Sequence, residues 1–288
     1  MKFFLVAGVV ALLLSGCGRL ETIPYTPAQT PESWLRIQPF AEVQVGDSAI
    51  IVVQPSTTAI VYLLGIITLG AGAYFLRIRA GQQARLWWGI ALLLWGVGAL
   101  LAGTSYEALS YQLKCAGRAV CIWTTWWEVA YLVLSVASID AMLVAGAYCC
   151  TLGVWRRRMV GYAAANIALY TLVVVLGALL PVRFLISFEL LILVSAPAIV
   201  IFLVLNGRRY ARFKQPQDAA LLVAWGWLIL TIGAYFVYYL SGLTPWLWER
   251  GLWFSENDVL HIGLILWMLY LALGVAGRVQ DLDGSSLP

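Results

Sequence analysis

Seven long apolar stretches constrain this chain more than any other feature of its sequence. Each is long enough, as a helix, to cross a hydrocarbon layer about 30 Å thick. They lie near residues 58–77, 86–110, 124–150, 159–180, 183–205, 219–242 and 254–276. With 62% hydrophobic and 11% charged residues, the chain has too much apolar surface for a soluble domain. We therefore predict an all-α membrane protein, with a bundle of seven transmembrane helices over residues 57–277.

The first residues have the pattern of a bacterial secretory signal. Met1 and Lys2 precede an apolar run, Phe3 to Leu14, that is too short to span a bilayer. The run leads into Leu14-Ser15-Gly16-Cys17, which resembles a lipobox, where the cysteine is acylated and the chain is cut before it. We expect a signal peptide over residues 1–16 and lipidation of Cys17; an uncleaved or differently cleaved signal is the alternative.

A short segment of soluble character, residues 17–56, precedes the first span. It begins with a tether rich in proline and threonine, from Thr22 to Pro31, which cannot form a regular helix or a central strand. Residues 41–45 and 49–53 then read as two strands around a turn. We expect a small β-hairpin that lies on the helices.

The basic residues predict the orientation of the bundle, because Lys and Arg are enriched in cytoplasmic loops. One set of alternate loops carries eleven: Arg77, Arg79, Arg85, Arg156, Arg157, Arg158, Arg208, Arg209, Arg212, Lys214 and Arg278. The other set, counted from Cys17, carries six: Arg19, Arg36, Lys114, Arg118, Arg183 and Arg250. The amino terminus and hairpin are thus expected in the periplasm and the tail, residues 278–288, in the cytoplasm of a bacterium, with the spans in the inner membrane. Clusters between spans also exclude a nucleic-acid-binding face.

The cysteines agree with this orientation. Cys115 and Cys121 fall in a predicted periplasmic loop and enclose a short segment with a glycine, so we predict a disulfide between them. Cys149 and Cys150 fall at the cytoplasmic end of the third span, where we expect small, reduced core residues. No metal-ligand spacing links any of the cysteines.

Ionisable side chains within or beside the spans are candidates for function, because burying a charge in a membrane is unfavourable. They are Glu107, Glu128, Asp140, Glu189, Glu256, Asp258 and His261. One interpretation is a polar cavity open to the periplasm, built from Glu107, Glu128, Glu189, Asp258 and His261. The alternative is that Glu107, Glu128 and Glu256 lie at headgroup level while His261 bonds to Asp258 or Asn257. For Asp140 we expect a structural hydrogen bond with Ser138 or a neighbouring helix.

Three of the spans carry a pattern seen in a superfamily of membrane hydrolases. Ser105-Tyr-Glu107-Ala-Leu-Ser110, Glu128 and Asp258-x-x-His261 together resemble the alkaline ceramidase and progestin/adipoQ-receptor superfamily. Its members bind zinc through histidines and activate water against an amide or ester. The resemblance implies a lipid-like substrate, with His261, Asp258, Glu128 and Glu107 as acid, base or metal ligands.

The sequence departs from that pattern at the zinc-binding positions. Lys114, Leu109 and Ile265 stand where the superfamily has histidines, and a single histidine cannot supply a three-histidine site. His261 and Asp258 with other carboxylates suit a harder divalent cation better. Retinal is not expected, because no lysine falls within the seventh span.

Three functions stay open, and the sequence does not decide whether the protein is an enzyme. The first is a ligand-binding, sensor or assembly component that meets a lipid-like ligand or a membrane-protein partner in the bilayer. The second is a metal-dependent hydrolase of a lipid-like amide or ester. The third is a proton-coupled carrier, which needs Asp140 and Glu189 along one polar path.

Overall fold

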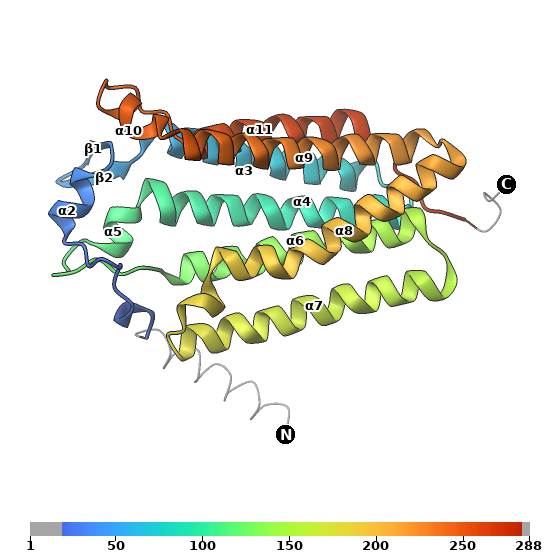
Figure 1. Ribbon diagram of the computed structural model, residues 1–288, viewed down its shortest axis with the longest axis horizontal. Helices are drawn as coiled ribbons and strands as arrows, with labels where there is room; N and C mark the ends of the chain where they lie inside the picture. Colours follow the sequence, from blue (N-terminus) through green and yellow to red (C-terminus); the bar gives the residue numbers. More distant parts are fainter. Residues whose placement is uncertain (1–18, 284–288) are drawn as a thin grey trace.

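The computed structural model describes residues 19–283, and these form a helical bundle with a small β-hairpin at one end (Figure 1). Within residues 19–283, seven helical segments are long and apolar enough to cross a membrane, which confirms the predicted fold class. The predicted signal peptide and the lipidation site Cys17 lie outside the described residues.

The spanning helices follow the predicted order. They are α3 (Pro55–Arg77), α4 (Gln83–Ala102) continued by the π-helical turn η2 (Gly103–Ala108), α6 (Trp126–Cys150), α7 (Gly153–Leu179), α8 (Phe188–Phe213), α9 (Pro216–Ser241), and α11 (Glu256–Tyr270) continued by the π-helical turn η4 (Leu271–Val275). The short helices η1 (Leu20–Thr22) and α2 (Pro31–Arg36) precede the first span, and α5 (Ser110–Lys114), η3 (Arg183–Ile186) and α10 (Leu243–Trp248) lie between spans.

The fifth span differs most from its predicted limits. Residues 183–186 form the separate turn η3, and α8 begins only at Phe188 because the Ser187 hydroxyl accepts a hydrogen bond from the Leu190 amide, 3.3 Å away. At its other end α8 runs on to Phe213, so the arginines predicted in the following loop lie in its last turns. Pro197 lies within α8, which continues through it as one helix.

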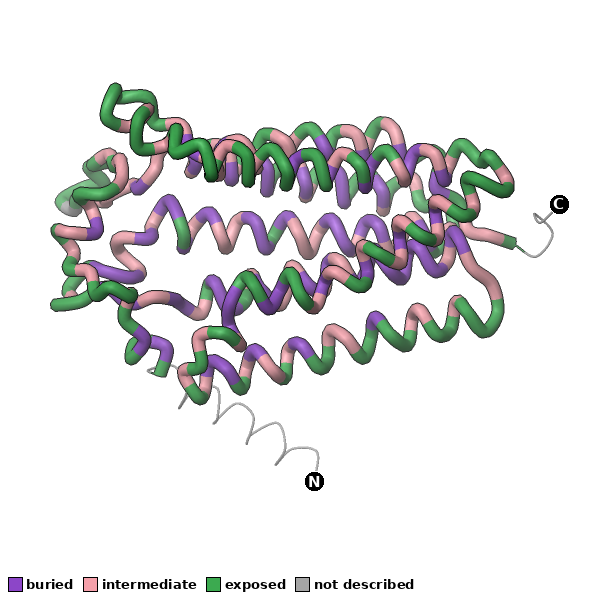
Figure 2. Tube along the Cα trace, in the orientation of Figure 1, coloured by how far each residue is buried: buried purple, intermediate pink, exposed green. Residues whose placement is uncertain are grey.

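Six of the seven spans pack in a closed ring. The neighbours around it are α3, α4, α6, α8, α9 and α11, and α11 returns to α3. The seventh, α7, packs outside the ring, mainly on α6 and η3. Burial follows this arrangement: 61% of the apolar stretch of α6 is buried but only 17% of that of α7 (Figure 2).

Large aromatic side chains form part of the core inside the ring. Trp225 stacks on Phe202 with ring centroids 4.3 Å apart, and the Trp267 indole donates to the Ala224 carbonyl at 2.8 Å. Glycines let α3 and α4 approach closely: a Cβ on Gly72 would lie 3.0 Å from the Gly89 carbonyl oxygen. Such small-residue contacts are typical of helices packed within a bilayer.

The two ends of the bundle differ in what covers them. At one, called the hairpin end, the antiparallel strands β1 (Phe40–Val45) and β2 (Ser48–Val53) confirm the predicted hairpin, each one residue longer than expected. β2 packs on α5, η2 and α3, and Val53 is buried with Trp34 against the bonded pair Cys115–Cys121. The predicted disulfide is therefore present.

The opposite end, called the tail end, is crossed by the last described residues. The Asp281 carboxylate accepts hydrogen bonds from the Gln83 and Ala84 amides, at 2.8 and 2.7 Å, and so caps the start of α4. The Leu282 amide donates to the Tyr148 carbonyl at 2.9 Å, at the end of α6. The tail segment thus ties two helices of the ring together.

Candidate functional site

A π-helical turn at the hairpin end places the first residues of the site. After Ala102 the helix α4 widens into η2, whose start at Gly103 has no room for a side chain, because a Cβ there would lie 2.4 Å from Val61. Turns of this type are frequent at functional sites. In η2 both Ser105 and Glu107 are buried.

An ion pair between Lys114 of α5 and Glu128 of α6 forms the centre of the site. Both residues are almost fully buried, with 2% and 1% of their surfaces exposed, and the ammonium contacts Glu128 Oε1 directly. The Ser105 hydroxyl also donates to that oxygen, at 2.8 Å, and lies 2.7 Å from the Thr125 hydroxyl. The carboxylate of Glu128 therefore has both a cation and a hydroxyl as partners.

Aromatic side chains enclose the ammonium. Lys114 Nζ lies 4.8 Å from the centre of the Tyr106 ring, in cation–π geometry, and 3.5 Å from the Tyr25 hydroxyl. Burial alone disfavours the charged form, but the Glu128 carboxylate and Tyr25 outweigh it and raise the pKa of Lys114 above its ordinary value. The lysine is thus held as a cation inside the protein.

Two further carboxyl groups lie near this pair without a cation of their own. Glu107 is within electrostatic range of Lys114, Glu128 and Asp258, and its Oε2 atom is buried with no hydrogen-bond partner. Asp258 is fully buried; its Oδ2 atom accepts from the Ser255 amide at 2.6 Å, whereas Oδ1 has no partner. Glu107 is thus within range of both the Lys114–Glu128 pair and Asp258, and none of the ion pairs among residues 19–283 includes Glu107 or Asp258. The hairpin-end cluster consists of Ser105, Glu107, Lys114, Glu128 and Asp258.

The structure thus brings together three of the predicted residues, Glu107, Glu128 and Asp258, from three spans. It adds Lys114, which in the sequence reads as a loop charge and as a departure from the superfamily pattern. The signal available in the sequence was a lysine directly before a predicted disulfide cysteine, Cys115, and between two acids of the predicted spans, Glu107 and Glu128.

The remaining predicted residues lie outside the cluster. His261 makes no hydrogen bond to Asp258 or Asn257 among residues 19–283, and its Nδ1 atom is buried without a partner, so the structure does not contain the bond considered as one alternative. Glu189 is exposed in the first turn of α8, and the Glu256 carboxylate accepts from the Thr244 hydroxyl at 2.5 Å. Neither side chain contributes to a polar cavity with the other acids.

Asp140 has the structural partner expected for it on a neighbouring helix. The Asn166 amide of α7 donates to both of its carboxylate oxygens at 3.1 Å. The other expected partner, Ser138, donates instead to the Ala91 carbonyl of α4 at 2.8 Å. Asp140 therefore fastens α7 to α6.

The residues present do not fit the metal site that we considered from sequence. Within residues 19–283 no three histidine, cysteine, aspartate or glutamate side chains are placed to hold one ion. His261 and Asp258 lie on one helix and no third such ligand joins them. The side chains at this end therefore do not match the donor set of a bound metal ion.

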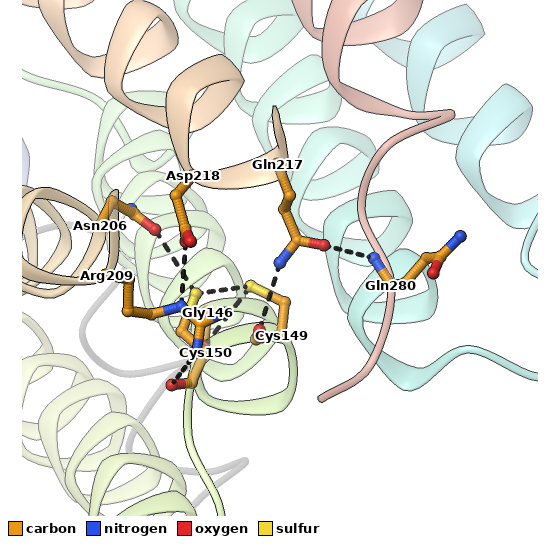
Figure 3. A network of polar contacts seen from close by, with 8 residues as sticks. All are labelled: Gly146, Cys149, Cys150, Asn206, Arg209, Gln217, Asp218 and Gln280. Carbon is orange, nitrogen blue, oxygen red and sulfur yellow. Dashed lines mark hydrogen bonds and ion pairs between the residues drawn. The ribbon is translucent and has the colours of Figure 1, made fainter. Parts of the chain in front are cut away.

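A second polar cluster, the tail-end network, lies at the opposite end of the bundle (Figure 3). Arg209 of α8 donates to Asp218 of α9 at 3.0 Å and also reaches the Cys150 carbonyl at 3.3 Å. The thiols of Cys149 and Cys150 are 3.1 Å apart, and both are buried and reduced. The network also contains Asn206, whose Oδ1 atom lies 3.4 Å from the Cys150 sulfur, and Gln217, which bonds the Cys149 carbonyl and the Gln280 amide.

The fold and the hairpin-end cluster define a multi-pass helical membrane protein with a charged site buried at one end. Residues 56–280 match the model of a family of unknown function (DUF6962), and the chain belongs to that family. No curated protein and no solved structure is significantly similar to the chain.

Proposed function

We propose that the protein is a ligand-binding membrane protein, acting as a sensor or assembly component, and that its ligand presents a positively charged group to the hairpin-end cluster. The observation that carries this proposal is an excess of buried carboxyl groups: Glu107 is within electrostatic range of Glu128 and Asp258, and of these three only Glu128 has a cation in contact with it, Lys114. An ionisable group buried in a membrane protein is unfavourable unless it has a partner, so unpartnered carboxyl groups are candidates for binding a ligand.

The unpartnered oxygens indicate where the ligand would bind. Glu107 Oε2 and Asp258 Oδ1 are buried acceptors with no donor, whereas the oxygens of Glu128 and Asp258 that face Lys114 and Ser255 already have donors. An ammonium or similar cation between Glu107 and Asp258 would supply both missing donors.

Tyr25 and strand β2 cover the cluster, so a change on ligand binding can reach the outer surface of the bundle. Tyr25 touches Lys114, and β2 packs directly on η2 and α5, which carry Glu107 and Lys114. A ligand that displaces either residue therefore moves the surface that the hairpin presents. A sensor of this kind requires residues 41–54, and their deletion is expected to abolish its response.

We place the hairpin end in the periplasm and the tail end in the cytoplasm of a bacterial inner membrane, with Cys17 as a lipidated amino terminus. The disulfide at the hairpin end supports an oxidising compartment there. The excess of arginine at the tail end supports a cytoplasmic location for it.

The test is thermal unfolding of the full chain purified in a neutral detergent. Ethylammonium chloride is the probe, compared with sodium chloride at equal ionic strength. We expect the amine to raise the unfolding temperature of the native protein, and Glu107→Gln and Asp258→Asn to remove that increase. Glu249→Gln, which changes an exposed acid near the same end, is the matched control. An increase that survives both cluster substitutions would contradict the proposal, as would no increase in the native protein.

A lipid hydrolase is the second candidate, because three residues of the ceramidase-like pattern lie near one another: Glu128 and Asp258 are both within electrostatic range of Glu107. Elemental analysis of the purified protein distinguishes it from a binding protein. Near-stoichiometric zinc or manganese that is lost in His261→Ala would favour the hydrolase. A carrier has no such support: Asp140 pairs with Asn166 and Glu189 is exposed, so they share no polar path within the described residues.

A further inference from the structure

A groove lies between α9 and the π-helical end of the last span, on the surface that faces lipid at the tail end. Its volume is about 610 Å³. One wall is the first two turns of α9 and the other is the end of α11 with η4, which lie side by side. It is lined by Pro216, Ala219, Ala220, Val223, Leu269, Tyr270, Leu273, Gly274 and Arg278.

The groove is built into the fold, because small residues and a fixed aromatic ring form its base. A Cβ on Gly274 would lie 2.7 Å from the Tyr270 ring, so glycine is what lets that ring lie flat against η4. The Tyr270 hydroxyl donates to the Ala220 carbonyl at 3.2 Å and holds the two walls together. The hollow therefore does not depend on a flexible side chain moving aside.

The walls are apolar along the depth of the membrane. Val223, Leu269 and Leu273 expose 50%, 40% and 84% of their surfaces on this face. From Pro216 to Val223 the wall of α9 extends about 10 Å at 1.5 Å per residue. This depth and this chemistry suit the upper part of an acyl chain.

The mouth of the groove, in contrast, is positively charged. Arg278 is exposed there, its guanidinium contacts the Gly274 carbonyl, and none of the ion pairs among residues 19–283 includes it. Lys214 lies two residues before Pro216 and is exposed. The 26-residue helix α9 begins here without a side-chain cap, so its first free amides add positive potential.

Neither of the two carboxylates nearest this mouth in the sequence is placed to attract a cation there. Asp218 points into the bundle and pairs with Arg209, and Asp281 caps α4. The charges therefore select an anionic partner, as basic pockets between transmembrane helices do for anionic lipid headgroups.

We propose that this groove binds one anionic phospholipid of the leaflet at the tail end, with an acyl chain between α9 and η4 and the phosphate of the headgroup on Arg278. The site is separate from the hairpin-end cluster, since it lies at the other end of the bundle, and it does not depend on the function proposed for that cluster.

Native mass spectrometry of the full chain in neutral detergent tests this site. The protein is titrated with phosphatidylglycerol or with phosphatidylcholine of the same acyl chains. We expect phosphatidylglycerol to bind more tightly, and Arg278→Gln to weaken its binding about tenfold through loss of a charge-assisted contact. Arg157→Gln, which changes an exposed arginine on α7, is the control and should leave binding unchanged.

A second variant tests the acyl-chain part of the groove. Ala219→Phe fills the hollow and should weaken binding of both lipids, whereas Val200→Phe, at an exposed apolar position of α8, should not. Equal affinity for the two lipids together with no effect of Arg278→Gln would overturn the proposal. So would a native dimer that Ala219→Phe converts to a monomer, because the groove would then be an interface between two copies.

Discussion

The two ends of the bundle each bury an ion pair, but the charges are balanced at one end and not at the other. At the tail end one guanidinium, from Arg209, meets one carboxylate, from Asp218. At the hairpin end the ammonium of Lys114 meets the carboxylate of Glu128, with the carboxyl groups of Glu107 and Asp258 nearby. A balanced pair holds helices together, whereas the unpartnered carboxyl oxygens of Glu107 and Asp258 leave acceptors that a cationic ligand would complement.

The elements that carry the two pairs also differ. Arg209 and Asp218 belong to consecutive helices, so their pair closes a local turn between α8 and α9. The hairpin-end cluster gathers residues from η2, α5, α6 and α11, and the last of these is far from the others in the sequence. A change in the hairpin-end cluster therefore displaces several elements at once. Such a cluster suits a binding site whose occupancy alters the surface of the protein at a distance. Substitutions at both ends test this contrast, from the largest expected effect to the smallest.

Removing the ammonium at the hairpin end should have the largest effect. Lys114→Met leaves Glu128 as a buried carboxylate without its cation, and we expect the free energy of unfolding to fall by about 3–5 kcal/mol. Chemical denaturation in detergent measures it. The double variant Lys114→Met/Glu128→Gln, which removes both charges, should recover much of the loss. Equal losses in the single and double variants would mean that packing, not charge, is responsible.

Breaking the tail-end pair should cost less, because Arg209 keeps 13% of its side chain exposed. We expect Arg209→Gln to lower the free energy of unfolding by about 2 kcal/mol, in the range for hydrogen bonds to charged groups. The response to ethylammonium should stay at its native size. If Arg209→Gln abolishes the stabilisation by ethylammonium, the two ends are coupled, and the tail-end network does more than hold α8 and α9 together.

Neutralising surplus acid should have the opposite sign. Glu107→Gln removes a buried carboxyl group whose ionised form is disfavoured by burial and by Glu128 and Asp258, and we expect the ligand-free protein to become more stable, by at most about 1 kcal/mol. Asp218→Asn at the tail end keeps a similar shape but should destabilise, since Arg209 loses its partner. The same denaturation experiment compares them. If both Glu107→Gln and Asp218→Asn lower the free energy of unfolding, the carboxyl groups at the two ends do not differ in the way proposed here.

Features that depend on a local sequence pattern could be predicted from the sequence, and contacts between distant residues could not. The spans, the hairpin and the disulfide were predictable because apolar length, alternation and cysteine spacing are local properties of the chain. Glu107, Glu128 and Asp258 were found because an acid in an apolar stretch is conspicuous wherever it packs.

Contacts between residues that are distant in the sequence leave no local pattern from which they could be predicted. Lys114 follows the second span, where a lysine reads as a soluble loop residue, and only the way α5 folds back places it against Glu128. The turn η3 was missed because residues 183–186 are nearly as apolar as the helix after them, and Ser187 alone marks the start of α8. The tail-end network joins residues separated by more than fifty positions, such as Cys150 and Asn206, which sequence spacing cannot connect.

The smallest effect concerns an exposed ion pair at the hairpin end, between Glu21 of η1 and Arg118 of the disulfide loop, 2.9 Å apart. The hydrogen bond from Arg118 and its charge hold the pKa of Glu21 below its ordinary value of 4.5. A lowered pKa in the folded state means that the pair contributes stability above that ordinary value and loses it as the pH falls through the lowered one. Because the Glu21 side chain is 51% exposed, the contribution should be only a few tenths of a kcal/mol. Unfolding of the native protein and of Arg118→Gln between about pH 6 and about pH 3 measures it: the two should differ slightly at the higher pH and converge at the lower one. A difference that persists in acid would mean that Arg118 acts through packing against the disulfide loop, and the exposed and buried pairs at this end would then differ in kind and not only in size.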